Sequence, residues 1–548
     1  MPRLVLGPIL RYVDEQAATI WVQADGPCEV EILGARERTF CVDGLHFALV
    51  VVEGLAAGDE HPYEVRLDGE RAWPEEGSAF PASTIRPPAS PDRREVVFGS
   101  CRVTRPHEPP YVLRATEDPA GQGIDALRAY ALRLARARGD ARGPDLLLML
   151  GDQIYADQPS PALERALADR DRPADVPSGE LADVCEYAMA YREAWSEPAI
   201  RWLLSTVPVT MVFDDHEIHA EWRISQGWVD EMNAEPWFDR HIRAGMVAYW
   251  LFQHLGNLAP AELHDSELYA AVRAAPDAGE LLAAHMSTEG RQVGQSRWSF
   301  ARDVGCARLV VIDSRAGRVV TPGRRELIQA EEWRWVREQA ARPARHLLLA
   351  SSIPFLLAPG LHHTEAFDEA LADGAWGRLG AVVGEKLRRL AVMDHWASFQ
   401  SSFQRVAELL DDAAHGRLGE TPASVVMLSG DVHHCYLAEV GFRGRTAPRA
   451  PVWQAVCSAF RKELAPHERR VIAFGHTRLG ERLARRLSRA IGVRALPLDW
   501  RVVERPAYRN QVATLTLDGE RAAVRVEAVV DGEWRDPRLE TAFERTLT

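Results

Sequence analysis

Four short polar segments carry side chains that could bind metal ions. They read Gly99-Ser-Cys-Arg102, Gly151-Asp-Gln-Ile-Tyr-Ala-Asp157, Asp214-Asp-His-Glu217 and Ser429-Gly-Asp-Val-His-His434. Thiolate, phenolate and imidazole groups suit a transition ion such as iron, whereas carboxylates also suit calcium, manganese or magnesium. We therefore expect these segments to contribute to a mixed metal site.

The number of acidic groups in these segments favours two metal ions over one. Several carboxylates in one crevice would repel each other and raise one another's pKa unless cations neutralised them. Two ions also suit in-line displacement at phosphorus, because one activates a water or hydroxide and both hold the phosphoryl oxygens. The reaction that this chemistry favours is hydrolysis of a phosphoester by a metal-bound hydroxide nucleophile.

Each polar segment directly follows an apolar run that is typical of a buried strand. These runs cover residues 95–98, 145–150, 208–213 and 424–428, and two similar runs cover 308–312 and 346–350. An amphipathic helix is expected at 124–134, where apolar residues recur at spacings of three and four. Ligands bind beyond the carboxyl ends of strands in open α/β sheets, so the four segments are expected to converge. This part of the chain is predicted to be α/β.

The first 85 residues have a different pattern. Short β-type runs at 18–22, 29–33, 47–52 and 63–67 are separated by turn-forming residues, which predicts a small all-β sandwich. The proline-rich stretch 81–92 is the best candidate for a domain boundary. We therefore expect an N-terminal β-sandwich domain over residues 1–85 and an α/β domain over residues 93–548.

Net charge, hydrophobic runs and cysteine spacing limit the binding partners and the cell compartment that we expect for this chain. The formal net charge of -14 argues against a protein that wraps nucleic acid. The N-terminus lacks the pattern of a secretory signal peptide, and no run approaches the ~18 residues of a membrane span. The seven cysteines form no CxxC pair, which suits a reducing compartment. A cytoplasmic location is the resulting expectation, with a small-molecule substrate and an oligomeric state that the sequence does not fix.

The four segments, in this order and at these strand ends, resemble a known family. The chain is similar to the alkaline phosphatase D (PhoD-like) metallophosphoesterases, which are relatives of the purple acid phosphatases. The resemblance extends to the N-terminal Gly7-Pro8 and to the strand Ala18-Thr-Ile-Trp-Val22. It implies a metallophosphatase-type α/β/β/α sandwich preceded by a fibronectin III- or immunoglobulin-like domain, with phosphatase or phosphodiesterase activity.

The resemblance also implies a role for each of the metal ligands. At the first site, Asp152 would bridge two ions, and the ferric-type site would be completed by Cys101, Tyr155 and His433. At the second site the expected ion is Ca²⁺, with Mn²⁺, Mg²⁺ or Zn²⁺ as alternatives, and its expected ligands are Asp215 and Asp431. The resemblance therefore implies a binuclear Fe³⁺ and Ca²⁺ centre.

Two further residues have expected catalytic roles. His216 would hydrogen-bond the phosphoryl group or protonate the leaving oxygen. Arg102 is expected to clamp phosphate, and a surface ion pair is the competing interpretation. After Glu217 the chain departs from the family pattern, and Glu221 could replace the carboxylate or amide of its relatives. For His434 we expect a structural role.

Several alternatives stay open. The chain could be a catalytically silent protein that binds phosphorylated ligands, and the sequence does not separate monoesters from diesters. The cysteines outside the motifs are predicted to be buried, namely Cys28, Cys41, Cys185, Cys306 and Cys457, while Cys435 is left open. The basic segment 461–494 is predicted to contain a helix that packs through its leucines and exposes its arginines, the alternative being a lid or a contact with an anionic surface.

Overall fold

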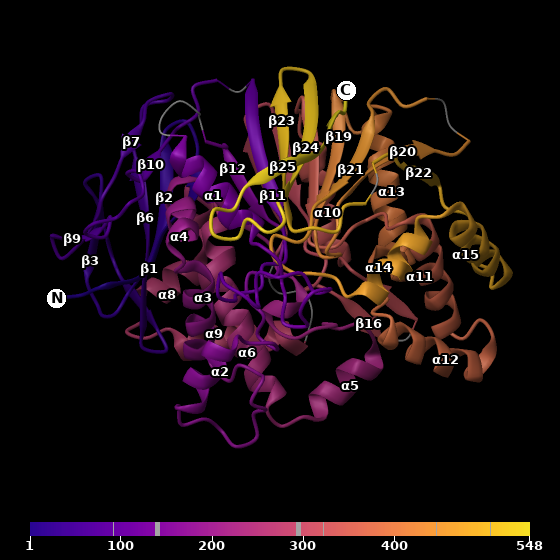
Figure 1. The fold of residues 1–548 in the computed structure, drawn as a ribbon, viewed down its shortest axis with the longest axis horizontal. Coiled ribbons are helices and arrows are strands. Elements are labelled where there is room, and N and C mark those ends of the chain that lie inside the picture. The colour runs from indigo at the N-terminus through magenta and orange to yellow at the C-terminus, as the bar shows by residue number, and fades with distance from the viewer. Residues whose placement is uncertain (91, 138–142, 292–296, 322, 445–446, 505) are drawn as a thin grey trace.

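The structure is a computed structural model that describes residues 1–548 apart from 91, 138–142, 292–296, 322, 445–446 and 505. Two central sheets lie face to face (Figure 1). The strands of the first are β11 Arg93–Gly99, β12 Leu146–Met149, β13 Val209–Met211, β23 Gln511–Asp518, β24 Arg521–Val529 and β25 Leu539–Thr546. The strands of the second are β14 Phe300–Val304, β15 Ala307–Val311, β18 His346–Ser351, β19 Ser424–Ser429, β20 Tyr436–Phe442, β21 Val452–Val456 and β22 Leu498–Val502.

Each of the two sheets has a parallel part, and the two sheets share a buried core. The first sheet runs β13-β12-β11-β23-β24-β25, and the second runs β14-β15-β18-β19-β21-β20-β22. Within the first sheet β11, β12 and β13 are parallel, as are β15, β18, β19 and β21 in the second. Apolar side chains of both sheets form one buried cluster between them. The six apolar runs of the α/β part are therefore strands, as predicted.

Helices cover the outer face of each sheet. The first sheet is covered by α1 Ala126–Arg136, α3 Val184–Trp195, α4 Pro198–Thr206 and α6 Phe238–Tyr249. The second is covered by α10 Ala330–Ala340 and α13 Gln400–Ala414. This confirms the expected α/β/β/α sandwich. In the described part of the chain the remaining α-helices are α2 Pro161–Ala168, α5 Gln226–Ala234, α7 Pro260–Asp265, α8 Glu267–Ala274, α9 Gly279–Arg291, α11 Pro359–Ala372, α12 Gly377–Leu390, α14 Pro466–Gly475 and α15 Arg478–Ala490.

The N-terminal region is all β, as expected. One sheet has the order β1-β2-β6-β5, with β1 Leu4–Val13, β2 Ala17–Ala24, β5 Phe40–Val42 and β6 Leu45–Glu53. Another has the order β4-β3-β8-β9, with β3 Glu29–Ile32, β4 Ala35–Arg38, β8 Val65–Leu67 and β9 Glu70–Trp73. A short pair joins β7 His61–Pro62 to β10 Thr84–Ile85. Buried apolar residues from these strands form their own core.

The β-region also shares a core with the α/β sandwich. Trp21 on β2 packs in the same buried cluster as α3, α4 and α6, and its indole Nε1 donates to the backbone oxygen of Leu251 at 3.0 Å. Arg11 on β1 is fully buried and donates to the backbone oxygens of Phe252 and Gln253. The two regions are therefore joined by apolar packing and by buried hydrogen bonds.

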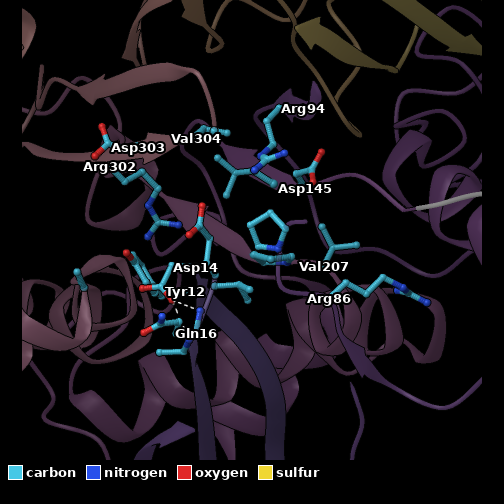
Figure 2. A pocket seen from close by; sticks show the side chains of 18 of the residues that line it. Tyr12, Asp14, Gln16, Arg86, Arg94, Asp145, Val207, Arg302, Asp303 and Val304 are labelled. Carbon is cyan, nitrogen blue, oxygen red and sulfur yellow. Dashed lines mark hydrogen bonds between the residues drawn. The ribbon is translucent and has the colours of Figure 1, made fainter. Parts of the chain in front are cut away.

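A cavity of about 890 Å³ lies between these two regions (Figure 2). Tyr12 and Asp14 line it from the β-region, and Asp145 and Arg302 line it from the sandwich. Asp145 directly precedes β12, so the cavity lies at the opposite end of the strands from the polar segments. None of the four polar segments lines this cavity, so the metal site predicted from them is not located there.

Helix α15 packs in the opposite sense to the prediction. Its buried residues are small ones, Gly480, Ala484 and Ser488, whereas Leu479, Leu483 and Leu487 are exposed. The small residues allow a close approach to α11, which leaves the leucines outside the contact. The predicted leucine-packed helix is therefore wrong in its orientation.

Candidate metal centre

The polar segments converge beyond the carboxyl ends of strands from both sheets. Cys101 follows β11, Asp152 follows β12, Asp214 follows β13 and Asp431 follows β19. Ligand-type atoms within 4.8 Å of one another form three overlapping groups, namely Cys101/Asp152/His433, Asp152/Asp215/His216 and Asp152/Asp214/Asp215/Asp431. All three groups contain Asp152, so its carboxylate lies at the centre of the cluster.

Tyr155 joins the cluster through the same carboxylate. Its hydroxyl donates to Asp152 Oδ2 at 3.1 Å, and its ring centroid lies 4.4 Å from that of His216. The residues expected from the sequence to be metal ligands are therefore all brought together, and Asp214 joins them.

The backbone at these strand ends adopts the left-handed region. The φ angles of Cys101, Asp152, Asp431 and His433 are 56°, 53°, 65° and 50°. Positive φ is uncommon outside glycine, costs free energy, and concentrates at functional sites. Gly151 also has a positive φ, and a Cβ there would lie 2.5 Å from Asp214 Cβ. The chain thus accepts local strain that brings the side chains of adjacent strand ends into contact.

The chemistry of the donor set fits bound cations. Asp152 Oδ1 and Asp214 Oδ2 are buried, and neither finds a hydrogen-bond donor among the described residues. A buried carboxylate oxygen without a partner is costly unless a donor or a cation satisfies it. Burial raises the pKa of both carboxyl groups, although Arg315 partly opposes this at Asp214. A cation between them would remove the penalty.

The pKa values of Cys101, Tyr155 and His433 are also shifted by burial and by neighbouring charges. Burial raises the pKa of the Cys101 thiol and of the Tyr155 phenol, and neighbouring carboxylates such as Asp152 raise both further. The pKa of His433 is lowered by burial and by the positive charges of Lys462 and His216. A neutral imidazole is the form that coordinates metals, and a bound cation would favour the thiolate and the phenolate.

Arg315 is a member of the site for which the sequence analysis proposed no role. It lies at the carboxyl end of β15, is almost fully buried, and pairs with Asp214 and Asp394. Its Nη2 lies 3.3 Å from Asp431 Oδ1 and 3.8 Å from Asp215 Oδ1. Burial would raise the pKa of Asp215, but Arg315 and His216 outweigh it and lower that pKa. Arg315 therefore supplies positive charge beside the expected second metal site.

The other oxygen of Asp431 is held by His395. His395 Nε2 lies 3.1 Å from Asp431 Oδ2, and its Nδ1 lies 2.8 Å from Glu365 Oε1. Burial would lower the pKa of His395, but Glu365 and Asp431 outweigh it and raise that pKa. The arrangement Glu365–His395–Asp431 orients the Asp431 carboxylate from the side of the second sheet.

His216 is held by a second unpredicted partner. Its Nδ1 lies 2.8 Å from Asp157 Oδ1, and Asp157 Oδ2 accepts the backbone N–H of Ala220 at 2.9 Å. Burial and Lys462 would lower the pKa of His216, but nearby carboxylates outweigh them and raise it to about 9. Asp157 thus fixes the ring through Nδ1, which leaves Nε2 facing the cluster.

Lys462 lies beside that ring nitrogen. Its Nζ is 3.4 Å from His216 Nε2 and 4.2 Å from the centroid of the Tyr155 ring. Among the described residues no carboxylate forms an ion pair with Lys462. The sequence contains only one other lysine, Lys386, which is exposed on α12. Sequence reasoning missed Lys462 because it lies in no motif and follows no predicted strand.

Arg102 does not have the surroundings expected of a phosphate clamp. Its guanidinium is buried, with Nε and Nη2 both 2.8 Å from Asp125 Oδ2 and Nη1 2.6 Å from the backbone oxygen of Ala194. Asp125 also caps α1 by accepting the N–H of Arg128. The pKa of the Asp125 carboxyl group is lowered to about 2, because Arg102 and other cations outweigh the effect of burial. The geometry corresponds to the ion-pair interpretation, here in a buried rather than a surface position.

Glu221 and His434 both lie near the metal centre. Glu221 donates its backbone N–H to Asp215 Oδ2 at 2.9 Å, and among the described residues its carboxylate belongs to none of the ligand clusters. The ring of His434 stacks on Tyr436 and Tyr508, and its Nδ1 lies 2.7 Å from the backbone oxygen of Val432. His434 is therefore packed as expected, whereas Glu221 contacts the second site through its backbone.

All seven cysteines are free. Cys28, Cys435 and Cys457 are buried, but Cys41, Cys185 and Cys306 are partly exposed. The prediction of burial was thus wrong for these three. Cys41 lies on β5, Cys185 in the first turn of α3, and Cys306 between β14 and β15, and they are hydrogen-bonded to Asp277, Asp43 and Asp92 in that order.

Two face-to-face sheets with thiol, phenol, imidazole and carboxylate groups at their strand ends form an α/β/β/α sandwich with a candidate metal site. The sequence model of the PhoD-like phosphatase family matches residues 120–479. The chain therefore belongs to the PhoD-like phosphatase family. Residues 1–85 match a domain of unknown function (DUF7800).

One solved structure shows the same fold, and a second solved structure also matches the chain. A structure described as that of PhoD is 14% identical, with a TM-score of 0.60, and the match covers 99% of this chain and 90% of that one. Purple acid phosphatase PPD1 from yellow lupin (Lupinus luteus) seeds is 10% identical over 98% of this chain and 73% of that one, with a TM-score of 0.48. No curated protein matches the chain.

Proposed function

We propose that the protein hydrolyses phosphoesters, monoesters or diesters, at a binuclear centre of Fe³⁺ and Ca²⁺. The observation that carries this proposal is the position of Asp152 in all three ligand groups, with a buried oxygen that has no donor among the described residues. Asp152 would bridge the ions. The iron ligands would be Cys101, Tyr155 and His433, because thiolate, phenolate and imidazole favour a transition ion.

The second ion would be held by oxygen ligands. Asp215 and Asp431 remain the proposed ligands, and Asp214 adds a third carboxylate whose Oδ2 is free of donors among the described residues. Oxygen ligands alone suit Ca²⁺. When bound, the two ions would neutralise the carboxylates, polarise the phosphoryl oxygens and acidify the attacking water.

The proton-transfer residue is proposed to be His216. Asp157 binds Nδ1, so Nε2 is the nitrogen that can exchange a proton with the leaving oxygen. This contact fixes the direction of the ring before substrate arrives. Asp157 would be a positioning residue, because it acts through His216.

The phosphate-binding residue is proposed to be Lys462 rather than Arg102. Arg102 is neutralised by Asp125, whereas Lys462 is half-buried at the cluster and has no carboxylate ion pair among the described residues. Lys462 and His216 present nitrogen atoms to the same space. An anionic phosphoryl group there would accept from both, and such charge-assisted hydrogen bonds are the strong ones.

Hydrolysis of p-nitrophenyl phosphate and bis-p-nitrophenyl phosphate by metal-loaded protein tests the function. We expect turnover of at least one ester, lost on chelation, restored by metal, and lowered at least about a hundredfold in Asp152→Asn. Asp59→Asn, an exposed carboxylate of the β-region, is the matched control. Metal-replete protein that binds inorganic phosphate but turns over neither ester would support the silent binding protein instead.

A further inference from the structure

Helix α15 presents an apolar surface that its own chain does not cover. Leu479, Leu483 and Leu487, which we call the leucine stripe, are 59%, 45% and 51% exposed. They are four residues apart, so they lie on one side of the helix. A row of exposed leucines on an ordered helix indicates contact with another molecule or with a membrane.

The packing of α15 shows why the leucine stripe stays outside. A Cβ on Gly360 of α11 would lie 2.8 Å from the backbone oxygen of Gly475, so α11 approaches the α14–α15 turn closely. Ser488 Oγ donates to the backbone oxygen of His363 at 2.6 Å. The helix is thus fixed to α11 through its small residues, and it cannot turn its leucines inward without losing this contact.

The same helix is strongly basic. Between residues 478 and 490 there are five arginines and one acidic residue, Glu481, which pairs with Arg485. In the described part of the chain, no carboxylate forms an ion pair with the other four arginines, which are Arg478, Arg482, Arg486 and Arg489. Arg482 and Arg486 each precede a leucine of the stripe, so cationic and apolar groups adjoin on the exposed side.

Helices next to α15 also expose apolar side chains. Figure 1 shows α12, α14 and α15 gathered around α11 at one side of the molecule, and each contacts α11. Phe474 and Val471 on α14 are 50% and 58% exposed, and Leu379 on α12 is 85% exposed. The exposed apolar groups are therefore concentrated on this helical side.

We propose that α15 and α14 bind the surface of an anionic phospholipid membrane. An amphipathic helix with leucines beside arginines lies in the interface, with its apolar groups among the acyl chains and its arginines at the headgroups. The negative potential of such a surface attracts basic segments locally, and salt screens the acidic remainder of the protein beyond ~8–10 Å.

Charge distinguishes this partner from a second copy of the chain. In a two-fold symmetric dimer the same patch faces itself, so the arginines of α15 would meet the arginines of the other α15. Like charges facing each other in that way are unfavourable, whereas phospholipid headgroups supply the opposite charge. In the described residues no helix is long and apolar enough to cross a bilayer, so the proposed contact is with the surface.

The contact adjoins the metal centre along the chain. α14 begins four residues after Lys462, whose ammonium lies at His216. Membrane binding would therefore attach to the headgroup layer a segment that is continuous in sequence with Lys462. The proposal concerns binding and does not depend on turnover, so its test is independent of the hydrolysis assay.

Co-sedimentation with phosphatidylcholine vesicles, with and without ~30% phosphatidylserine, tests the proposal. We expect binding only to the phosphatidylserine vesicles, weakened by salt, and lowered at least about tenfold in Leu483→Gln/Leu487→Gln and in Arg482→Gln/Arg486→Gln. Glutamine keeps helix propensity, and Leu33→Gln/Arg38→Gln in the β3–β4 hairpin is the matched control.

Unchanged thermal unfolding of each variant, measured beside wild type, shows that the fold is kept. Wild-type protein that does not bind the phosphatidylserine vesicles, or helix variants that bind as tightly as the control, would overturn the proposal. Concentration-dependent dimerisation that Leu483→Gln/Leu487→Gln abolishes, without vesicle binding, would assign the surface to a second copy instead.

Discussion

Two basic side chains near the metal ligands have opposite surroundings. Arg102 directly follows Cys101, yet Asp125 and the backbone oxygen of Ala194 occupy its donors. Lys462 is far from the motifs in sequence, yet its Nζ lies 3.4 Å from His216 Nε2. The donors of Arg102 are occupied by this buried ion pair and by a backbone oxygen, which favours the ion-pair interpretation over the phosphate clamp.

Replacing Lys462 tests this assignment directly. Lys462→Gln is expected to lower kcat/KM for a phosphoester by about tenfold to a hundredfold, because it removes a charge-assisted hydrogen bond worth about 1.5–3 kcal/mol. Metal content should stay unchanged, and Lys462→Arg should restore part of the loss. Steady-state kinetics are the measurement.

The second lysine of the chain provides the control for that experiment. Lys386→Gln on α12 removes the same charge from an exposed position and should leave kcat/KM within about twofold of wild type. Equal kinetics for Lys462→Gln and Lys386→Gln would show that Lys462 does not contact substrate.

The six proposed ligands could be predicted from sequence because each lies in a short motif after a recognisable strand. Arg315 and His395 could not, because their function depends on contacts with Asp431, 116 and 36 residues away. Their positive charge and hydrogen bonds fix a carboxylate of the second site. Such partners come together only through the packing of the second sheet.

The strand ends act as rigid supports for the site. Cys101 and Asp152 follow β11 and β12, which are neighbouring parallel strands, and both have positive φ. Gly151 permits the close contact between the ends of β12 and β13, because any side chain there would meet Asp214. The turn after β12 therefore determines how closely two carboxylates approach.

Gly151→Ala is expected to perturb this turn. The added Cβ combines an unfavourable φ of 104° with an overlap against Asp214, and should lower the free energy of unfolding by about 1–3 kcal/mol and weaken metal binding. Gly69→Ala has a φ of 86° with open space around it, so it reports the backbone effect alone. Denaturant unfolding and metal titration are the measurements. Equal effects of the two substitutions would show that the contact with Asp214 is unimportant.

Elements differed in how clearly the sequence predicted them. The six apolar runs of the sandwich are strands because parallel strands are covered on both faces. The antiparallel strands β23, β24 and β25, which complete the first sheet, were not predicted from the sequence. They share no single pattern: β23 is almost entirely buried, β24 alternates only along its first half, and β25 is mostly exposed. In α15 leucine burial was the usual expectation, but Gly480, Ala484 and Ser488 give a closer helix contact.

The molecule as a whole combines two regions that share buried surface. Trp21 and Arg11 of the β-region are inserted against residues 251–253 of the sandwich, and both are almost fully buried. The division at residues 85–93 stays a prediction about domains. The extent of this packing indicates that the β-region supports the sandwich on the side of the first sheet.

Charge is distributed unevenly over the molecule. The chain has a formal net charge of -14, yet α15 is basic and the metal centre gathers carboxylates around Arg315. The negative net charge therefore does not predict the local charge at α15 or at the metal centre, because exposed charges are screened within about a Debye length. The proposed metal ions and the proposed phospholipid surface each carry the charge opposite to that of the groups they would contact.

The proposed binuclear centre is tested most directly by the metal content of protein purified without chelator. Elemental analysis should find two ions per chain, one of them iron, with a visible tyrosinate-to-iron band that disappears in Tyr155→Phe. Asp152→Ala should lose both ions, because all three ligand groups share that carboxylate. Wild-type protein without stoichiometric metal, even after reconstitution with iron and calcium, would contradict the binuclear centre.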